Sequence, residues 1–269
     1  MTMIRTWPVL AVVFVAGLAA AAPALGAFPG ENGKIAFMSD RVTATKPEAD
    51  FEIFVMNANG SHQRQITFNA LDDEEPAWSP DGRRIAFVRD LDPIRGQSDD
   101  DLLTMNADGS KERNLTSSPG VGDSSPGWSP DGRRIAFLSD RDGDLEVYTM
   151  RPNGSSVRQL TSNEGIEFQP NWSPDGRRIT FTSDRTDSAE VYVMDADGTN
   201  QTSLTAKRGG VFSAWSPDGR KIVYLSGDYD IFTMNADGSH RRRLTRGPAF
   251  DFESDWQPLP DGDCHDRRR

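Results

Sequence analysis

The sequence has 269 residues, of which 36% are hydrophobic and 26% charged, and its formal net charge at pH 7 is −11. This acidity argues against nucleic acid as a partner, because phosphate binding depends on lysine and arginine to neutralise backbone charge. A single cysteine, Cys264, excludes an internal disulfide framework, and three histidines argue against a histidine-rich metal site.

The first 27 residues differ in character from the rest of the chain. An apolar run from Val9 to Ala22 follows Arg5, which is the only charged residue before Glu31. This pattern is typical of a cleaved secretory signal, and the run is shorter than the roughly 20 residues that span a bilayer. We therefore expect residues 1–27 to be removed. The mature chain would have no membrane span and would work in the periplasm, the cell envelope or outside the cell.

A repeat occupies the remainder of the chain. Copies of Trp-Ser-Pro-Asp-Gly begin at Trp78, Trp128, Trp172 and Trp215, and a degenerate copy begins at Trp256. Their spacings of 50, 44, 43 and 41 residues lie in the range of propeller repeats, in which each repeat is one small sheet.

Each repeat contains four strand signals, which follow one another in a constant order. The first enters the tryptophan, and the second follows the Pro-Asp-Gly turn at residues 35–37, 85–87, 135–137, 179–181 and 222–224. The third ends at Met56, Met105, Met150, Met194 and Met234. The fourth ends at Thr67, Thr116, Thr161, Thr205 and Thr245.

These signals predict an all-β fold, a single five-bladed β-propeller over residues 28–262. Its blades would be four-stranded antiparallel sheets. The mature chain opens on the second strand type and closes on the first, at Trp256. One blade would therefore combine the C-terminal strand with the N-terminal strands and close the ring. A six-bladed ring is the alternative, but it would need a sixth unit. Residues 263–269 end in three arginines and are expected to be a basic tail.

Residues 128–141, with the segments 146–150 and 158–161, resemble the WD-like PD repeat of TolB-like β-propellers. The resemblance recurs five times over about residues 34–262. It implies an exported propeller, and the family's namesake is periplasmic and binds partners of the Tol-Pal envelope system. That namesake carries an α/β domain before six blades, so the resemblance implies a TolB-like propeller and not a full-length TolB.

The predicted topology collects the acidity on one face. The loops between the second and third strands and the connections between repeats lie on the same side, and they carry 23 acidic and 9 basic residues. The mature chain has a net charge of −12, so the remainder is close to neutral. The second-to-third loops are also longest in the first two repeats, which is typical of a binding side.

Two groups of acidic residues on this face are the predicted binding residues. Asp40, Asp90, Asp140 and Asp184 each follow a repeat aromatic by three positions and would form a ring that attracts cations or a basic partner. The densest acidic run is Asp72, Asp73, Glu74 and Glu75. The alternative is that these residues cap loop amides, pair with arginines or form a solvated loop.

One loop has carboxylates at alternate positions, namely Asp140, Asp142, Asp144 and Glu146. Calcium prefers such oxygen-rich loops, although the full EF-hand spacing is absent. A plain Asp-Gly hairpin loop is the alternative. No other cofactor is expected.

The sequence contains no Gly-x-Ser-x-Gly elbow and no nucleophile placed beside a base by motif. We therefore expect a monomeric, non-catalytic module that binds a protein or peptide, basic or associated with the cell envelope, through its acidic face. A secreted glycosidase or lyase with carboxylates at the channel mouth is the alternative, since it would need only a suitable pair of acids.

Overall fold

The computed structural model describes residues 33–41, 50–91, 99–186, 188–226 and 230–246. The regular structure in these ranges is entirely β-strand, arranged as five antiparallel sheets. Within them there is no helix that is long and apolar enough to cross a membrane. The signal segment (1–27), the segment around Trp256 and the tail (263–269) lie outside the described residues.

The sheets follow one another along the chain. The first contains β1 (Lys34–Ser39), β2 (Glu52–Asn57) and β3 (Arg64–Gln65). The second contains β4 (Asp73–Trp78), β5 (Arg84–Asp90), β6 (Asp100–Asn106) and β7 (Arg113–Asn114). The third contains β8 (Asp123–Trp128), β9 (Ile135–Ser139), β10 (Glu146–Met150) and β11 (Arg158–Gln159). The fourth contains β12 (Glu167–Trp172), β13 (Arg178–Ser183), β14 (Glu190–Asp195) and β15 (Thr202–Ser203). The fifth contains β16 (Val211–Trp215), β17 (Lys221–Ser226), β18 (Asp230–Asn235) and β19 (Arg242–Arg243).

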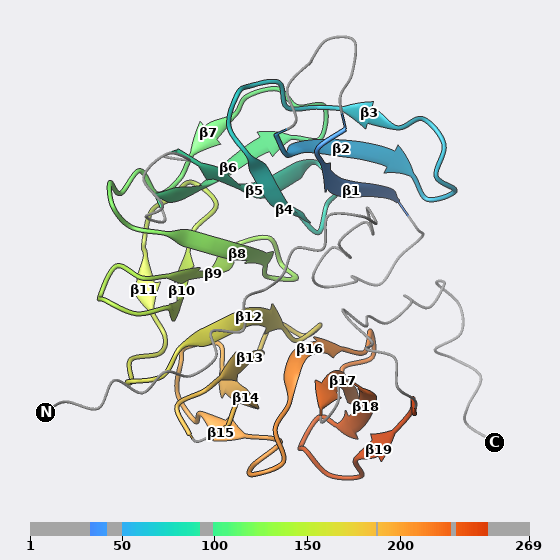
Figure 1. Cartoon of the computed structure of the whole chain (residues 1–269), viewed down its shortest axis with the longest axis vertical. Helices are drawn as coiled ribbons and strands as arrows, with labels where there is room; N and C mark the ends of the chain where they lie inside the picture. The colour runs from blue at the N-terminus through green and yellow to red at the C-terminus, as the bar shows by residue number, and fades with distance from the viewer. Residues whose placement is uncertain (1–32, 42–49, 92–98, 187, 227–229, 247–269) are drawn as a thin grey trace, which may run out of the picture.

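The five sheets are arranged around a common centre, with β4, β8, β12 and β16 on the inside and the two-residue strands at the periphery (Figure 1). Neighbouring sheets contact each other mainly through these inner strands. The predicted propeller of antiparallel blades is confirmed at this level, and five sheets agree with five blades. The described part of the first sheet has three strands, and the residues expected to supply its fourth lie outside the described ranges.

The Trp-Ser-Pro-Asp-Gly motif builds the turn that joins the first two strands of a sheet. In the second sheet, the Ser79 hydroxyl donates to Asp81 at 2.6 Å, and the same carboxylate accepts the N–H of Arg83 at 3.1 Å. Gly82 closes the turn with a φ of 65°, a conformation that side chains disfavour. The hydrogen bond from Ser79 lowers the pKa of Asp81. The same turn recurs in the third, fourth and fifth sheets.

The repeat tryptophans pack between neighbouring sheets. The indole N–H of Trp128 donates to the carbonyl of Ala77 in the preceding sheet at 3.2 Å, and Trp172 donates in the same way to Gly127. The guanidinium of Arg84 lies over the Trp128 ring, 4.6 Å from its centroid. These indole hydrogen bonds link the third and fourth sheets to the sheets that precede them.

Candidate functional site

Each inner strand of the last four sheets carries a β-bulge just before its tryptophan. One residue of each bulge has a positive φ although it is not glycine, and these residues are Glu75, Ser125, Gln169 and Phe212. Bulges redirect side chains and are common beside binding sites, and strained backbone of this kind often marks function. The inner strands therefore depart from regular strand geometry at the same point in each of these sheets.

The second sheet gathers carboxylates around one of these bulges. Asp90 at the end of β5 lies directly opposite Asp100 at the start of β6, and the Asp90 N–H donates to the carbonyl of Asp72 at 3.1 Å. Glu74 lies among them on β4. We call Asp72, Glu74, Glu75, Asp90 and Asp100 the acidic cluster. Like charges placed directly opposite each other on adjacent strands repel, and Asp90 and Asp100 occupy such opposite positions.

Within the acidic cluster, the pKa of Glu74 is raised. Burial raises the pKa of Glu74 from its ordinary value of 4.5 to about 7, and the charges of the four other members act in the same direction. Two members are also tied to backbone, because Asp72 accepts the N–H of Phe51 at 2.6 Å and Glu75 accepts that of Ser125 at 2.6 Å. A cationic group placed here would relieve the repulsion on Glu74.

Asp73 is separated from its three acidic sequence neighbours. It is fully buried, and the guanidinium of Arg89 donates to both of its oxygens, at 2.6 and 2.9 Å. Equivalent pairs join Arg141 to Asp123 at 2.8 Å and Arg185 to Glu167 at 2.7 Å. Asp73 therefore has a structural role in the described fold, whereas Glu74 faces the cluster.

The predicted ring of aspartates divides in the structure. Asp140 accepts the N–H of Gly122 at 2.8 Å, and Asp184 accepts that of Ile166 at 2.6 Å, so both cap a connection between sheets. Asp90 belongs to the acidic cluster, and Asp40 is exposed at the end of β1. The structure thus brings Asp90 together with Asp72, Glu74 and Glu75, and gives Asp140 and Asp184 a local partner. Binding of a ligand by the ring stays a prediction.

A set of buried acids was not singled out by the sequence analysis. Each is the first or second residue of the third strand type of its repeat, and the set is Glu52, Asp101, Glu146, Glu190 and Asp230. A threonine follows each acid 15 residues later. Its hydroxyl accepts the N–H of the residue after the acid, as in the bond from Val147 to Thr161 at 2.7 Å. This constant acid-to-threonine spacing is the signal that could have revealed them.

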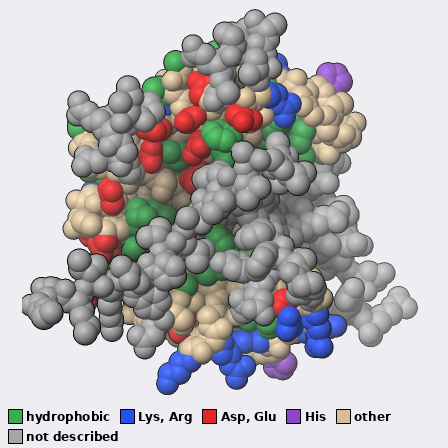
Figure 2. Space-filling view, viewed as in Figure 1, with side chains coloured by type: hydrophobic (Ala, Val, Ile, Leu, Met, Phe, Trp, Pro, Cys, Tyr) green, Lys and Arg blue, Asp and Glu red, His purple; other side chains and the backbone are tan. Residues whose placement is uncertain are grey.

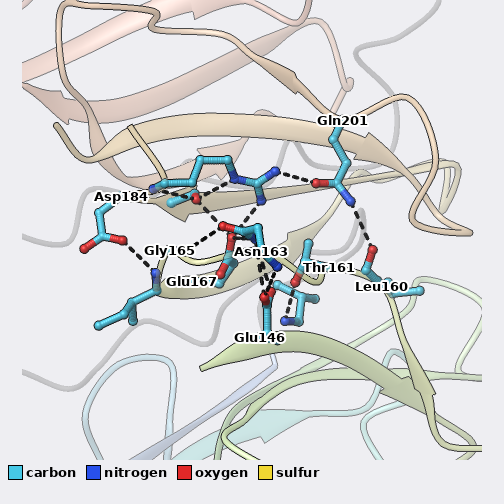
Figure 3. Close-up of polar contacts among 12 residues, drawn as sticks. Glu146, Leu160, Thr161, Asn163, Gly165, Glu167, Asp184 and Gln201 are labelled. Carbon is cyan, nitrogen blue, oxygen red and sulfur yellow. Dashed lines mark hydrogen bonds and ion pairs between the residues drawn. The ribbon is translucent and has the colours of Figure 1, made fainter. Parts of the chain in front are cut away.

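One of these acids takes part in a polar network between the third and fourth sheets (Figure 3). Asn163 donates its backbone N–H to Glu146 at 2.6 Å and its side-chain amide to Glu167 at 2.9 Å. The Glu167 carboxylate also accepts from Ser183 and from Arg185. Asn69 makes the same two connections, to Glu52 and Asp73, between the first and second sheets. These bridges position the connections between sheets. They lie on the side that carries the loops between second and third strands, which we call the long-loop side.

The predicted calcium loop contains a convergent set of three carboxylates. Oxygens of Asp142, Asp144 and Glu146 all lie within 4.8 Å of one another. Asp140 is not a member of this group and instead caps Gly122. Three of the four residues identified by their alternate spacing are therefore brought together.

Charge is distributed unevenly over the molecule. On the face shown in Figure 2, acidic side chains gather over the second and third sheets, and lysine and arginine side chains gather near the fifth. Several apolar side chains are exposed on the long-loop side, including Leu91 beside Asp90 and Phe168 on β12. The surface can therefore offer both negative charge and apolar contact to a partner.

Comparison with known proteins identifies the repeat. Residues 108–228 match the family model described as the TolB beta propeller domain. The Tol-Pal system protein TolB of Rhizorhabdus wittichii is 38% identical over 69 residues, which is 26% of this chain and 15% of that protein. The chain thus spans a small part of this relative.

Solved structures agree on the fold. TolB from Acinetobacter baumannii superposes with a TM-score of 0.66 at 24% identity, covering 81% of this chain and 54% of its own. An oligogalacturonate lyase from Vibrio parahaemolyticus superposes with a TM-score of 0.57 at 13% identity, covering 78% of this chain and 64% of its own. At these identities the likeness concerns architecture alone, and the same architecture serves a Tol-Pal protein and an enzyme.

Proposed function

We propose that this TolB-like β-propeller is a non-catalytic binding module that captures a basic protein or peptide through its acidic cluster. The observation that carries the proposal is the position of Glu74, half-buried among four other carboxylates. The nearby guanidinium of Arg89 is bonded to Asp73 and Glu112. A lysine or arginine from a partner would meet concentrated negative charge that the fold has already assembled, so little reorganisation would oppose binding.

The similarity to a Tol-Pal system protein supports a partner in the cell envelope. Export by residues 1–27 belongs to the same proposal, because an envelope partner requires a protein that leaves the cytoplasm. N-terminal sequencing of the protein recovered from cells tests this step. A mature N-terminus near residue 28 is expected, and a protein that begins at Met1 would contradict export.

The binding proposal is tested with variants that leave Asp73 intact. Replacement of Glu74 and Asp100 by their amides removes two charges from the cluster and retains nearly the same shapes. The control replaces Asp108 and Asp197, which are exposed in turns between third and fourth strands, by asparagine. Binding is measured at about pH 8.5, above the raised pKa of Glu74, so that both double variants remove two negative charges. A difference between them then reports position and not total charge.

Two measurements compare these variants. A fluorescent peptide with alternating lysine and leucine serves as a defined probe, and pull-down from an envelope extract followed by mass spectrometry searches for the natural partner. We expect the cluster variant to bind the peptide at least about tenfold more weakly, a loss of about 1.4 kcal/mol, and to lose the proteins captured by the wild type. Equal binding by the cluster variant and its control would overturn the proposal.

A carbohydrate-active enzyme is the second candidate, and the raised pKa of Glu74 favours it. A general acid must hold its proton near neutral pH, and a carboxyl group with a pKa of about 7 can do so. Assays on a panel of polysaccharides, with the wild type beside Glu74→Gln, test this function. Activity that the variant loses would support catalysis, and a panel without turnover would remove it.

The closed ring is also a proposal, supported by the packing between sheets. Gly109, Gly154, Gly198 and Gly238 each lie so close to a carbonyl of the preceding sheet that an added Cβ would stand 2.4 to 3.0 Å from it. Gly60 of the first sheet has no described atom that near. In the fifth sheet, the residue equivalent to these carbonyl-bearing residues is Leu244. Leu244 is 51% exposed, whereas the equivalent Leu204 of the fourth sheet is 4% exposed. Closure would bring Gly60 and Leu244 together.

A further inference from the structure

We propose that the loop between β9 and β10 binds one Ca²⁺ ion through Asp142, Asp144 and Glu146. The mutual separation of their oxygens, at most 4.8 Å, fits an ion whose bonds to oxygen are about 2.3–2.6 Å long, since ligands on opposite sides are then roughly 5 Å apart. Asp142 is exposed, Asp144 half-buried and Glu146 buried. The set therefore runs from solvent into the protein and offers an ion a route of entry.

A second observation lies at the buried end of this set. Glu167 is fully buried, and its Oε1 accepts from Asn163, Ser183 and Arg185. Its Oε2 has no hydrogen-bond partner among the described residues. The Glu167 carboxyl lies in contact with that of Glu146. A buried oxygen without a donor is costly, and a cation on Glu146 would stabilise it.

The equivalent position of the neighbouring sheet has a different set of donors. Glu146 accepts from Asn163, through its backbone N–H at 2.6 Å and its side-chain amide at 3.4 Å. Glu190 corresponds to Glu146, and it accepts from the Ser203 hydroxyl at 2.6 Å and from the Lys207 N–H at 2.7 Å. Ser203 lies opposite Tyr192 in the fourth sheet, and Gln159 lies opposite Tyr148 in the third.

Gln159 of the third sheet, which is equivalent to Ser203, makes a different hydrogen bond. The amide of Gln159 donates to Asp142, not to Glu146. The outer strand of the third sheet therefore orients a loop carboxylate and leaves Glu146 without the donor that Ser203 gives to Glu190. Carboxylate ligands oriented by a hydrogen-bond donor in this way are a common feature of metal sites.

The charge balance also favours a divalent cation. Asp142, Asp144 and Glu146 bring three carboxyl groups together, and the Glu167 carboxyl lies against that of Glu146. The two nearby arginines are bonded to the acids at the start of inner strands, since Arg141 binds Asp123 and Arg185 binds Glu167. A site made only of carboxylate oxygens selects a hard cation, and a partly exposed loop suits Ca²⁺ with a Kd of about 10⁻⁴–10⁻³ M, as in extracellular modules.

Terbium luminescence provides a direct test, because Tb³⁺ replaces Ca²⁺ and is excited by a nearby tyrosine. The Tyr148 hydroxyl contacts Asp142, so it would lie beside the bound ion. After treatment with a chelator, the exported chain should show saturable Tb³⁺ luminescence that Ca²⁺ displaces. Its melting temperature should rise with Ca²⁺ and return when the chelator is added again. Absence of both responses up to about 10 mM Ca²⁺, well above the expected Kd, would overturn the proposal.

Three variants distinguish Ca²⁺ binding by specific ligands from general attraction of the ion to negative charge. Asp144→Asn alters a half-buried loop residue and should weaken Ca²⁺ binding at least about tenfold. Asp197→Asn, an exposed turn residue in the fourth sheet, changes the net charge equally and should bind as the wild type does. Tyr148→Phe should lose most of the luminescence and keep most of the rise in melting temperature. Equal Ca²⁺ affinity of Asp144→Asn and the wild type would overturn the proposal. The loop would then be a plain Asp-Gly hairpin without a metal site.

Discussion

Asn163 holds the buried carboxylate of Glu146 through its own backbone N–H, at 2.6 Å. Because its side chain reaches Glu167 at 2.9 Å, one residue links the third strand of one sheet to the first strand of the next. The link depends on an amide in the connection between sheets, and it recurs at Asn69. Orientation of neighbouring sheets on the long-loop side thus depends on a few satisfied polar groups.

Asn163→Ala should destabilise the protein by about 1–3 kcal/mol, because Glu167 loses a donor but remains buried. Unfolding in urea, followed by tryptophan fluorescence, measures the loss. Ser162→Ala, at the exposed preceding position, is the matched control and should change stability by less than about 0.5 kcal/mol. If the two variants were equally stable, the bridge would contribute nothing.

Arg185→Ala should be more damaging, at about 3–5 kcal/mol, because it strands the fully buried Glu167 without its cation. The variant also loses the stacking of the guanidinium on Tyr192, whose ring centroid is 4.6 Å away. Arg185→Lys keeps the positive charge but lacks the planar guanidinium. Its free energy of unfolding should lie between those of the alanine variant and the wild type. The same denaturation assay ranks the three proteins.

An exposed ion pair should contribute much less to stability than the buried pair of Arg185 and Glu167. The Arg133 side chain is 86% exposed and lies 3.8 Å from Asp131, so Arg133→Ala should cost less than about 0.5 kcal/mol. A loss at Arg133 as large as that at Arg185 would contradict the distinction between buried and surface pairs.

Stability should fall as the pH rises toward neutrality, in part through Glu74. The folded protein raises the pKa of Glu74 above its ordinary 4.5 to about 7, so it binds this proton more tightly than the unfolded chain does. The contribution is fully present below about pH 4.5 and is lost as the pH rises through about 7. Glu74→Gln should therefore flatten the dependence of the urea midpoint on pH between about 5 and 8.

Part of the slope should remain in that variant, because burial also raises the pKa of Glu146 to about 7. Asp81→Asn is the control, since the pKa of Asp81 is lowered by its bond to Ser79 and its titration falls at lower pH. An unchanged slope in Glu74→Gln, measured in chelator to exclude metal effects, would show that Glu74 does not titrate in this window.

Ring closure can be tested with two matched glycine variants. Gly109→Ala places a Cβ 2.4 Å from the Ile66 carbonyl and should cost well over 1 kcal/mol, because it adds a clash to the strain at a φ of +87°. Gly60 has a φ of +79° but no described neighbour within 4 Å. If the ring closes onto Leu244, Gly60→Ala should cost as much as Gly109→Ala. A cost of only about 1 kcal/mol would indicate an open seam.

Much of the architecture could be read from the repeat. The Pro-Asp-Gly turn, the Ile-x-Phe strand and the strand ending in methionine are encoded locally, by turn chemistry and by alternation of apolar residues, so their positions followed from the printed sequence. Asp81 and Gly82 show why, since their roles depend on neighbours within five residues.

The composition of the site could not be predicted in this way. Asp72, Asp73, Glu74 and Glu75 look equivalent as a sequence, yet Asp73 is neutralised by Arg89 and Glu74 is not. Alternation along β4 and its bulge turn successive side chains to different sides.

The sequence by itself determined the repeat and the strand order, because each depends on neighbours along the chain. Tertiary structure alone decided which carboxylates are paired, capped or brought close to another carboxylate. Asp90 and Asp100 face each other across strands, Asp140 caps Gly122, and Glu146 meets Glu167 from the next sheet. The physical reason is that the pKa and the charge balance of a carboxyl group depend on burial and on groups brought near it by folding.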